Sequence, residues 1–169
     1  MNVIVVDGYN IIGAWGELQR LKEKDMAQAR DRLIEQMAEY KAFTGQRVIV
    51  VFDAYFVKGL ANKRNEHKVE IIYTKEKETA DECIERIVKD LKHVDNQVYV
   101  ATSDYAEQRT IFGRGALRKS ARELLIELKN IESEIEESID HYVKEKPQRN
   151  IPFEKSVLEV FEKWRRGDN

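Results

Sequence analysis

Residues 2–10 read Asn-Val-Ile-Val-Val-Asp-Gly-Tyr-Asn, a run of mostly β-branched residues that leads into an aspartate and a glycine. The pattern returns at residues 47–53, where Arg-Val-Ile-Val-Val-Phe precedes Asp53. Runs that are hydrophobic throughout are typical of central strands of a parallel sheet, which are buried on both faces. These two stretches therefore predict neighbouring strands of an α/β sheet, each followed by a carboxylate.

Further strands and helices alternate along the chain. Residues 69–73 and 97–101 have strand composition, and the second run is followed directly by Thr-Ser-Asp at 102–104. Helix starts with capping-box spacing occur at Asp25 and Gln28, at Thr79 and Glu82, and at Ser120 and Glu123. Such alternation favours right-handed crossovers. We expect an α/β three-layer sandwich with a central parallel sheet flanked by helices, the last long helix running to about Tyr142.

Two prolines divide the chain near its C-terminal end. Pro147 and Pro152 bracket a break, and the apolar residues beyond it have the spacing of one face of a short helix. We expect one domain over residues 1–146 and a C-terminal helical extension over 147–169 that packs on the same domain.

Composition narrows the function classes. The formal net charge is -2, so affinity for nucleic acid must come from local basic patches. A single cysteine, Cys83, cannot form an internal disulfide, and the N-terminus lacks the features of a signal peptide. No apolar stretch approaches the roughly 20 residues that cross a bilayer. We expect a cytoplasmic, monomeric protein with no membrane role.

Acidic residues fall where the predicted strands end or helices begin, at Asp7, Asp53, Asp81 with Glu82, and Asp104. Strand ends and helix starts of an open α/β sheet converge on one edge, so these carboxylates can meet in space. Carboxylates crowded together repel one another unless a cation is present. Hard divalent cations such as Mg²⁺ or Mn²⁺ take oxygen ligands and activate water for phosphodiester hydrolysis. The pattern therefore predicts a metal-dependent hydrolase.

Each acidic residue also has an ordinary structural explanation. Asp7 and Asn10 can satisfy turn and helix-start amides, and Asp81 can simply complement the helix dipole. In the functional interpretation Asp7 binds the metal and Asn10 orients a carboxylate, a water or the phosphate. Further ligands or supporting groups would come from Asp53, Glu82, Thr102, Ser103 and Asp104.

Two basic segments could bind nucleic acid. The first, expected on a flexible loop, supplies Arg109, Arg114, Arg118, Lys119 and Arg122. The second, residues 55–68, supplies Tyr55, Phe56, Lys58, Lys63 and Arg64. Aromatic rings beside cations suit single-stranded RNA, whose bases can stack on them. The alternative for the basic residues is a solvated surface, and for Tyr55, Phe56 and Trp15 it is core packing.

Four motifs together resemble a known family. They are Val-Val-Asp-Gly-Tyr-Asn-Ile-Ile at 5–12, Val-Phe-Asp-Ala-Tyr at 51–55, Thr-Ala-Asp-Glu at 79–82 and Ala-Thr-Ser-Asp at 101–104. In order and spacing they resemble the YacP-like proteins of the NYN branch of PIN-like nucleases. The resemblance implies a PIN-like sheet, dependence on Mg²⁺ or Mn²⁺, cleavage of single-stranded mRNA to a 5′-phosphate and a 3′-hydroxyl, and a ribosome partner.

By position, the resemblance also implies roles for individual residues. Asp7, Asp81 and Asp104 match the metal-binding acids of the family, Asn10 matches the polar partner in its first motif, and Asp53 is a weaker match. Two other functions stay open. One is an RNA- or ribosome-binding protein whose acidic site is inactive, and the other is a small-molecule phosphate hydrolase on the same scaffold.

Overall fold

The computed structural model describes residues 1–56, 63–66, 68–92, 95–104, 115–145 and 163–165. Its centre is a six-stranded sheet in the order β3-β4-β2-β1-β5-β6. The strands are β1 (Asn2–Asp7), β2 (Arg47–Phe52), β3 (Lys63–Glu66), β4 (Val69–Tyr73), β5 (Gln97–Ala101) and β6 (Leu117–Lys119). All neighbouring strands are parallel except β3 and β4, which are antiparallel. The predicted parallel sheet is confirmed, with one antiparallel strand at its edge.

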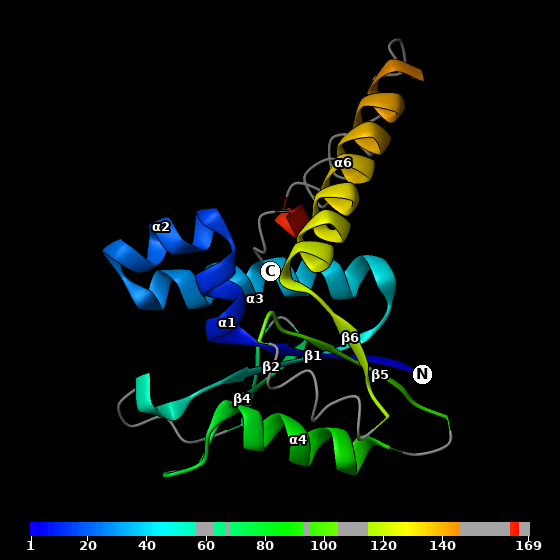
Figure 1. Cartoon of the computed structure of the whole chain (residues 1–169). Coiled ribbons are helices and arrows are strands. Elements are labelled where there is room, and N and C mark those ends of the chain that lie inside the picture. The colour runs from blue at the N-terminus through cyan, green and yellow to red at the C-terminus, as the bar shows by residue number, and fades with distance from the viewer. Residues whose placement is uncertain (57–62, 67, 93–94, 105–114, 146–162, 166–169) are drawn as a thin grey trace.

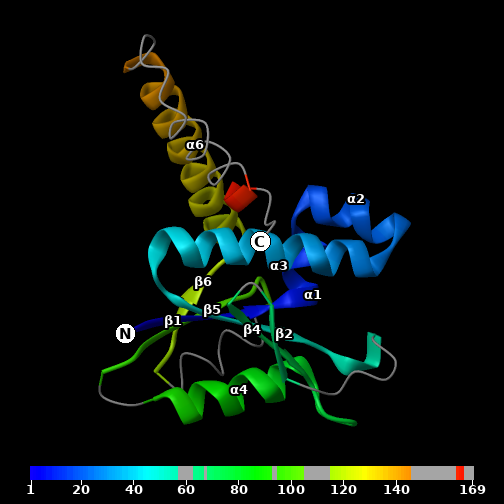
Figure 2. The same ribbon diagram turned by 180° about the vertical axis from the view of Figure 1, so that it is seen from behind.

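Helices cover both faces of the sheet. They are α1 (Gly8–Ala14), α2 (Gly16–Lys24), α3 (Met26–Thr44), α4 (Ala80–Leu91) and α6 (Ala121–Glu145), with a short 3₁₀ helix η1 (Ala54–Phe56) after β2. Figure 1 shows α4 alone on one side of the sheet and α1, α2 and α3 on the other, with α6 rising away from the body. The view from behind in Figure 2 shows the same three layers, as predicted.

The hydrophobic core has two parts because successive residues of a strand point to opposite faces. On β1, Val3 and Val5 pack in the cluster beneath α4, whereas Ile4 and Val6 pack in the larger cluster with residues of α1, α3 and α6. All four side chains are fully buried. The continuous hydrophobic run that predicted β1 is therefore explained by burial on both sides.

The structure corrects several expectations about local structure. No helix between Asp7 and Asp25 was expected from the sequence, whereas α1 begins at Gly8 and α2 follows it. Strand β6 lies in the segment expected to be a flexible loop, so that expectation is wrong for residues 117–119, and strand β3 was not predicted. The long last helix is confirmed and extends past the expected end to Glu145. The reason for the missed strands is their length, since short edge strands carry little periodic signal.

The proposed C-terminal extension lies mostly outside the described residues, and its boundary at 146 stays a prediction. Residues 163–165 are helical, and Trp164 packs against the larger core cluster. Within the described ranges, none of the helices combines the length and apolarity needed to span a membrane.

Candidate metal and RNA site at the carboxyl edge of the sheet

Asp7 and Asp104 lie at the carboxyl ends of two adjacent strands. Strands β1 and β5 pair in parallel, with Val6 opposite Ala101. Asp7 is the last residue of β1 and is only 7% exposed, and Asp104 follows shortly after the end of β5. The topology therefore brings both carboxylates to the same edge of the sheet, as the sequence predicts.

Asn10 fixes the turn that carries Asp104. Its Oδ1 accepts hydrogen bonds from the backbone N–H of Ser103 at 2.8 Å and from the Ser103 hydroxyl at 2.9 Å. Thr102 is fully buried, and its hydroxyl oxygen accepts the N–H of Asp104 at 3.1 Å. The N–H of Thr102 in turn donates to the carbonyl oxygen of Lys119. Helix α1, the end of β5 and β6 are thus joined around Asp104.

Asp81 occupies the first turn of α4. The Thr79 hydroxyl oxygen caps this helix by accepting the N–H of Glu82 at 3.2 Å, which confirms the predicted helix start. Asp81 is therefore not the capping residue, and its side chain, like that of Glu82, is exposed. Because α4 follows β4 through a short connection, its first turn lies on the carboxyl side of the sheet.

Asp53 has a structural task at the end of β2. Its Oδ1 accepts the backbone N–H of Tyr55 at 2.9 Å, and the hydroxyl of Thr74 accepts the N–H of Ala54 at 2.9 Å. These bonds shape the turn into η1. One Asp53 oxygen is therefore committed to the backbone, which suits the weaker match that the sequence motif gives this residue.

Sequence reasoning missed the contribution of the residues between Asp7 and Asn10. A Cβ on Gly8 would clash with the ring of Phe52, approaching its Cε1 to 2.3 Å, so only glycine fits. The Tyr9 ring packs on Phe52 at 5.2 Å between centroids, and its hydroxyl accepts a hydrogen bond from Arg30 at 3.2 Å. Burial raises the pKa of Tyr9, and Arg30 partly opposes this. Nothing in the sequence indicated the contact between Arg30 and Tyr9, because helix α1, which carries Tyr9, was not predicted.

Carboxylate oxygens are the donors that Mg²⁺ and Mn²⁺ take, and Mg²⁺ is often held by one or two carboxylates together with waters and substrate phosphates. The donor set at this edge fits that chemistry. Among the described residues, no three His, Cys, Asp or Glu side chains are arranged as a ready-made metal site. The metal ligands therefore stay a prediction.

The predicted basic residues divide into separate groups. Lys119 points inside: its Nζ lies 2.8 Å from Glu127 and 5.0 Å from the centre of the Tyr99 ring, and its side chain is 12% exposed. Its charge is thus satisfied within the fold instead of being presented to RNA. Arg118 is half-buried, and Arg122 is exposed on α6. Lys63 and Arg64 lie on β3. The remaining predicted cations, Lys58, Arg109 and Arg114, lie outside the described residues.

Trp15 and Tyr55, for which both core packing and RNA contact were considered, differ in their burial. Trp15 is 2% exposed, and its indole N–H donates to the Ala121 carbonyl oxygen at 2.8 Å, so core packing is correct for it. Tyr55 is 87% exposed, so core packing is wrong for Tyr55.

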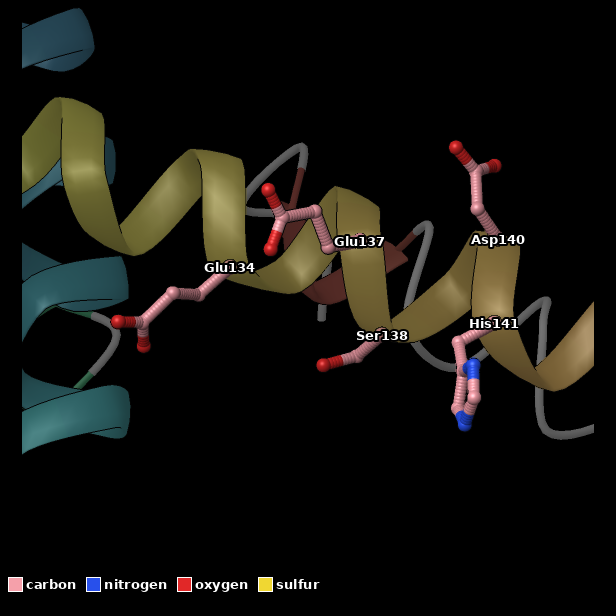
Figure 3. Close-up of a pocket in the computed structure, with 5 residues that line it drawn as sticks. All are labelled: Glu134, Glu137, Ser138, Asp140 and His141. Carbon is pink, nitrogen blue, oxygen red and sulfur yellow. The ribbon is translucent and has the colours of Figure 1, made fainter.

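A surface hollow lies away from this edge of the sheet. It is lined by Glu134, Glu137, Ser138, Asp140 and His141, all on the projecting half of α6. Figure 3 shows Glu134, Ser138 and His141 on one side of the helix, while Asp140 points to the other. Side chains that diverge in this way do not converge on a common ligand.

The fold and site now define a class of protein. A model of the YacP-like NYN domain matches residues 4–166, so the chain belongs to the YacP-like NYN family. NYN domains are part of a nuclease superfamily, and membership supports an RNA-related, nuclease-type function. The resemblance inferred from the four motifs is confirmed.

Individual relatives agree along the whole chain. The chain is 56% identical over 168 residues to the uncharacterized protein YacP of Bacillus subtilis (strain 168), with 99% of both chains covered. A crystal structure of Rae1 (YacP) from Bacillus subtilis matches with a TM-score of 0.77 at 56% identity. Its W164L mutant matches with a TM-score of 0.79 at 50% identity. Both comparisons cover 99% of this chain and 96% of the solved chain.

Proposed function

We propose that this protein is a metal-dependent endoribonuclease that cleaves single-stranded mRNA presented by a translating ribosome. The observation that carries the proposal is the bond between Asn10 and Ser103, which holds the turn bearing Asp104 against the helix that follows Asp7. Two carboxylates on neighbouring strand ends, fixed by an amide that is itself part of the motif, are an arrangement suited to phosphodiester chemistry.

The residues divide into ligands and supports. Asp7, Asp81 and Asp104 would hold Mg²⁺ or Mn²⁺ through their carboxylate oxygens. When bound, such a cation acidifies a coordinated water and neutralises charge on the scissile phosphate. Asn10 acts as a positioning residue. The hydroxyls of Thr102 and Ser103 are engaged in the turn, so they support Asp104 and are not assigned a phosphate contact.

The ribosome part of the proposal comes from the resemblance to the YacP-like proteins, and the charge of the protein is compatible with it. A protein with a net charge of -2 and carboxylates at its site gains little electrostatic attraction from free RNA. A ribosome would supply the substrate at a high local concentration and would need only basic patches on the protein where the two touch. The family relationship supports an RNA substrate.

The test is cleavage of a reporter mRNA by the purified full-length protein, with and without translating ribosomes, in Mg²⁺, Mn²⁺ or chelator. Cleavage sites are mapped at nucleotide resolution. Asp81→Asn is compared with Asp90→Asn, because both aspartates are exposed on α4 but lie in its first and last turns. We expect Asp7→Asn and Asp81→Asn to reduce cleavage to background and Asp90→Asn to retain it.

Other outcomes separate the alternatives. Unchanged cleavage in Asp7→Asn and Asp81→Asn, with RNA binding retained, would refute the catalytic assignment. Binding without any cleavage by the unaltered protein would favour an RNA- or ribosome-binding role. Hydrolysis of nucleotides or phosphomonoesters, indifferent to charge removal at Arg118, would favour a small-molecule hydrolase. Equal cleavage with and without ribosomes would remove the translation-dependent part.

A further inference from the structure

The ring of Tyr55 is presented to solvent at the end of a central strand. Its exposed fraction of 87% exceeds the 45% of Phe43, another exposed aromatic residue. A large aromatic ring so exposed contributes little to the core, so packing does not explain it. Proteins that bind single-stranded RNA use exposed aromatic rings of this kind as surfaces on which bases stack.

The backbone beneath this ring is anchored. The N–H of Tyr55 donates to the Asp53 carboxylate, and the N–H of Ala54 donates to the Thr74 hydroxyl. Thr74 is fully buried, and its own N–H donates to the carbonyl oxygen of Phe52 at 3.0 Å. Three hydrogen bonds thus connect the turn to the ends of β2 and β4. The ring is therefore attached to a backbone turn that is already ordered, so little conformational entropy of this turn is lost when a ligand binds.

This turn lies at the same edge as the candidate site. Strand β2 runs parallel to β1, with Val51 opposite Asp7, and η1 follows β2 directly. The Tyr9 ring packs on Phe52, the last residue of β2, at 5.2 Å between ring centroids. Tyr9 is the second residue after Asp7. The turn that carries Tyr55 therefore follows the strand next to the one that ends in Asp7, the first proposed metal ligand.

We propose that Tyr55 is a stacking platform for an unpaired base of the RNA beside the scissile bond. The inference rests on the proposed function, whose substrate it makes more specific: the nucleotide near the cleaved linkage must be unpaired to reach the ring. Every base has an aromatic face, so the platform accepts any base identity. The carboxylates at this edge repel the phosphates of RNA, so a site that relied on charge alone would not hold the RNA there. A neutral ring can bind a base next to these carboxylates.

The test measures binding of a single-stranded oligoribonucleotide in an Asp7→Asn background, so that the RNA stays intact. Tyr55→Ala should weaken binding about 5- to 150-fold, the range that loss of one stacked base produces. Tyr55→Trp should retain it. Phe43→Ala is the matched control, since Phe43 is exposed near the end of α3, just before the start of β2, at the opposite edge of the sheet. The Phe43→Ala variant should bind the RNA as tightly as the Asp7→Asn protein without further substitution.

A salt titration distinguishes stacking from charge. Loss of a phosphate contact lowers the slope of log affinity against log salt, whereas loss of stacking lowers affinity and leaves the slope unchanged. We expect Tyr55→Ala to leave the slope unchanged. A 2-aminopurine base in the RNA should show quenched fluorescence on binding, and the quenching should vanish in Tyr55→Ala.

Three results would overturn the inference. They are unchanged affinity of Tyr55→Ala, full rescue by Tyr55→Leu, which supplies apolar area without an aromatic face, and equal dependence on Tyr55 for fully duplex RNA. Circular dichroism and thermal unfolding would show that each variant is folded. If the unaltered protein cleaves RNA and Tyr55→Ala cleaves and binds equally well, only this inference fails. If the unaltered protein cleaves nothing yet binding needs the ring, only the nuclease proposal fails.

Discussion

Asn10 acts through one oxygen atom. Its Oδ1 accepts both the N–H and the hydroxyl of Ser103, a residue 93 positions away in the sequence. An acceptor engaged in this way orders the Asp104 turn and is less available to a metal ion. Its place in the site is therefore support for a neighbouring carboxylate, and this explains why an asparagine suits the position where a further aspartate would add repulsion.

Gly8 is required by close packing, and this can be tested within one short helix. An alanine Cβ at position 8 would lie 2.3 Å from Phe52 Cε1 and 3.0 Å from the Val51 carbonyl oxygen. We expect Gly8→Ala to lower the free energy of unfolding by about 1–3 kcal/mol, as overpacking does. The measurement is urea unfolding followed by circular dichroism.

Gly13 is the matched control for Gly8, since it lies in the same helix and a Cβ there meets nothing within 4 Å. Gly13→Ala should be neutral or should stabilise the protein by up to about 1 kcal/mol, because alanine loses less conformational entropy in a helix. Equal effects of the two substitutions would contradict the packing argument.

At the scale of elements, the central strands β1 and β2 were predicted better than the helices α1 and α2 for physical reasons. The runs that form β1 and β2 are hydrophobic at every position, a pattern that few other structures accommodate. Helices α1 and α2 are short and punctuated by glycine, and the junction between them is held by a bond from Trp15 to Ala121, distant in sequence. A contact of this kind has no local signal. The strand β6 has only three residues and is defined by its partner β5.

The candidate site was partly predictable for a similar reason. The rule that strand ends meet at one edge depends only on topology, so the positions of Asp7 and Asp104 followed from the sequence. The burial of Lys119 could not be predicted from the sequence, because nothing in the sequence indicates that its ammonium group pairs with Glu127. Burial acts to lower the pKa of Lys119, but the hydrogen bonds and charges of Glu127 and Tyr40 together outweigh it, and the pKa is raised.

The interface between α3 and α6 contains a titratable group with a measurable effect. Glu39 is 3% exposed, and burial, together with the negative charge of Glu132, raises its pKa from 4.5 to about 7 despite the opposing charges of Arg32 and Arg165. Because the folded state holds this proton more tightly than the unfolded state, the protein loses stability as pH rises from about 4.5 to 7. The full loss from this group is about 3 kcal/mol at most.

Glu39→Gln removes this dependence. Relative to the variant, the unaltered protein should lose free energy of unfolding between pH 5 and pH 8, as measured by urea unfolding at both values. Glu134→Gln, which changes an exposed carboxylate on α6, should leave the pH profile of the unaltered protein in place. A profile of Glu39→Gln parallel to that of the unaltered protein would show that the buried carboxyl does not titrate in this range.

At the scale of the whole molecule, acidic and basic groups serve different surfaces. The carboxyl edge of the sheet gathers carboxylates and the Tyr55 ring, whereas Arg122 is exposed at the base of α6, which projects from the body (Figure 1). A protein of net charge -2 thus depends on local cations to approach an RNA surface. Lys119 and Arg122 lie three residues apart on the chain, and comparing them separates the effect of a structural cation from that of an exposed one.

Arg122→Gln and Lys119→Met each remove one positive charge from the molecule but should affect different properties. If Arg122 contacts a phosphate of ribosomal RNA or mRNA, its loss weakens ribosome association and lowers the slope of log affinity against log salt by about 1. Lys119→Met should leave that slope unchanged, while the loss of its bond leaves Glu127 and the Tyr40 hydroxyl without this donor and lowers the melting temperature. Ribosome co-sedimentation over a salt series and thermal unfolding measure the two effects. Equal changes of slope in both variants would mean that net charge, and not the exposed position of Arg122, governs binding.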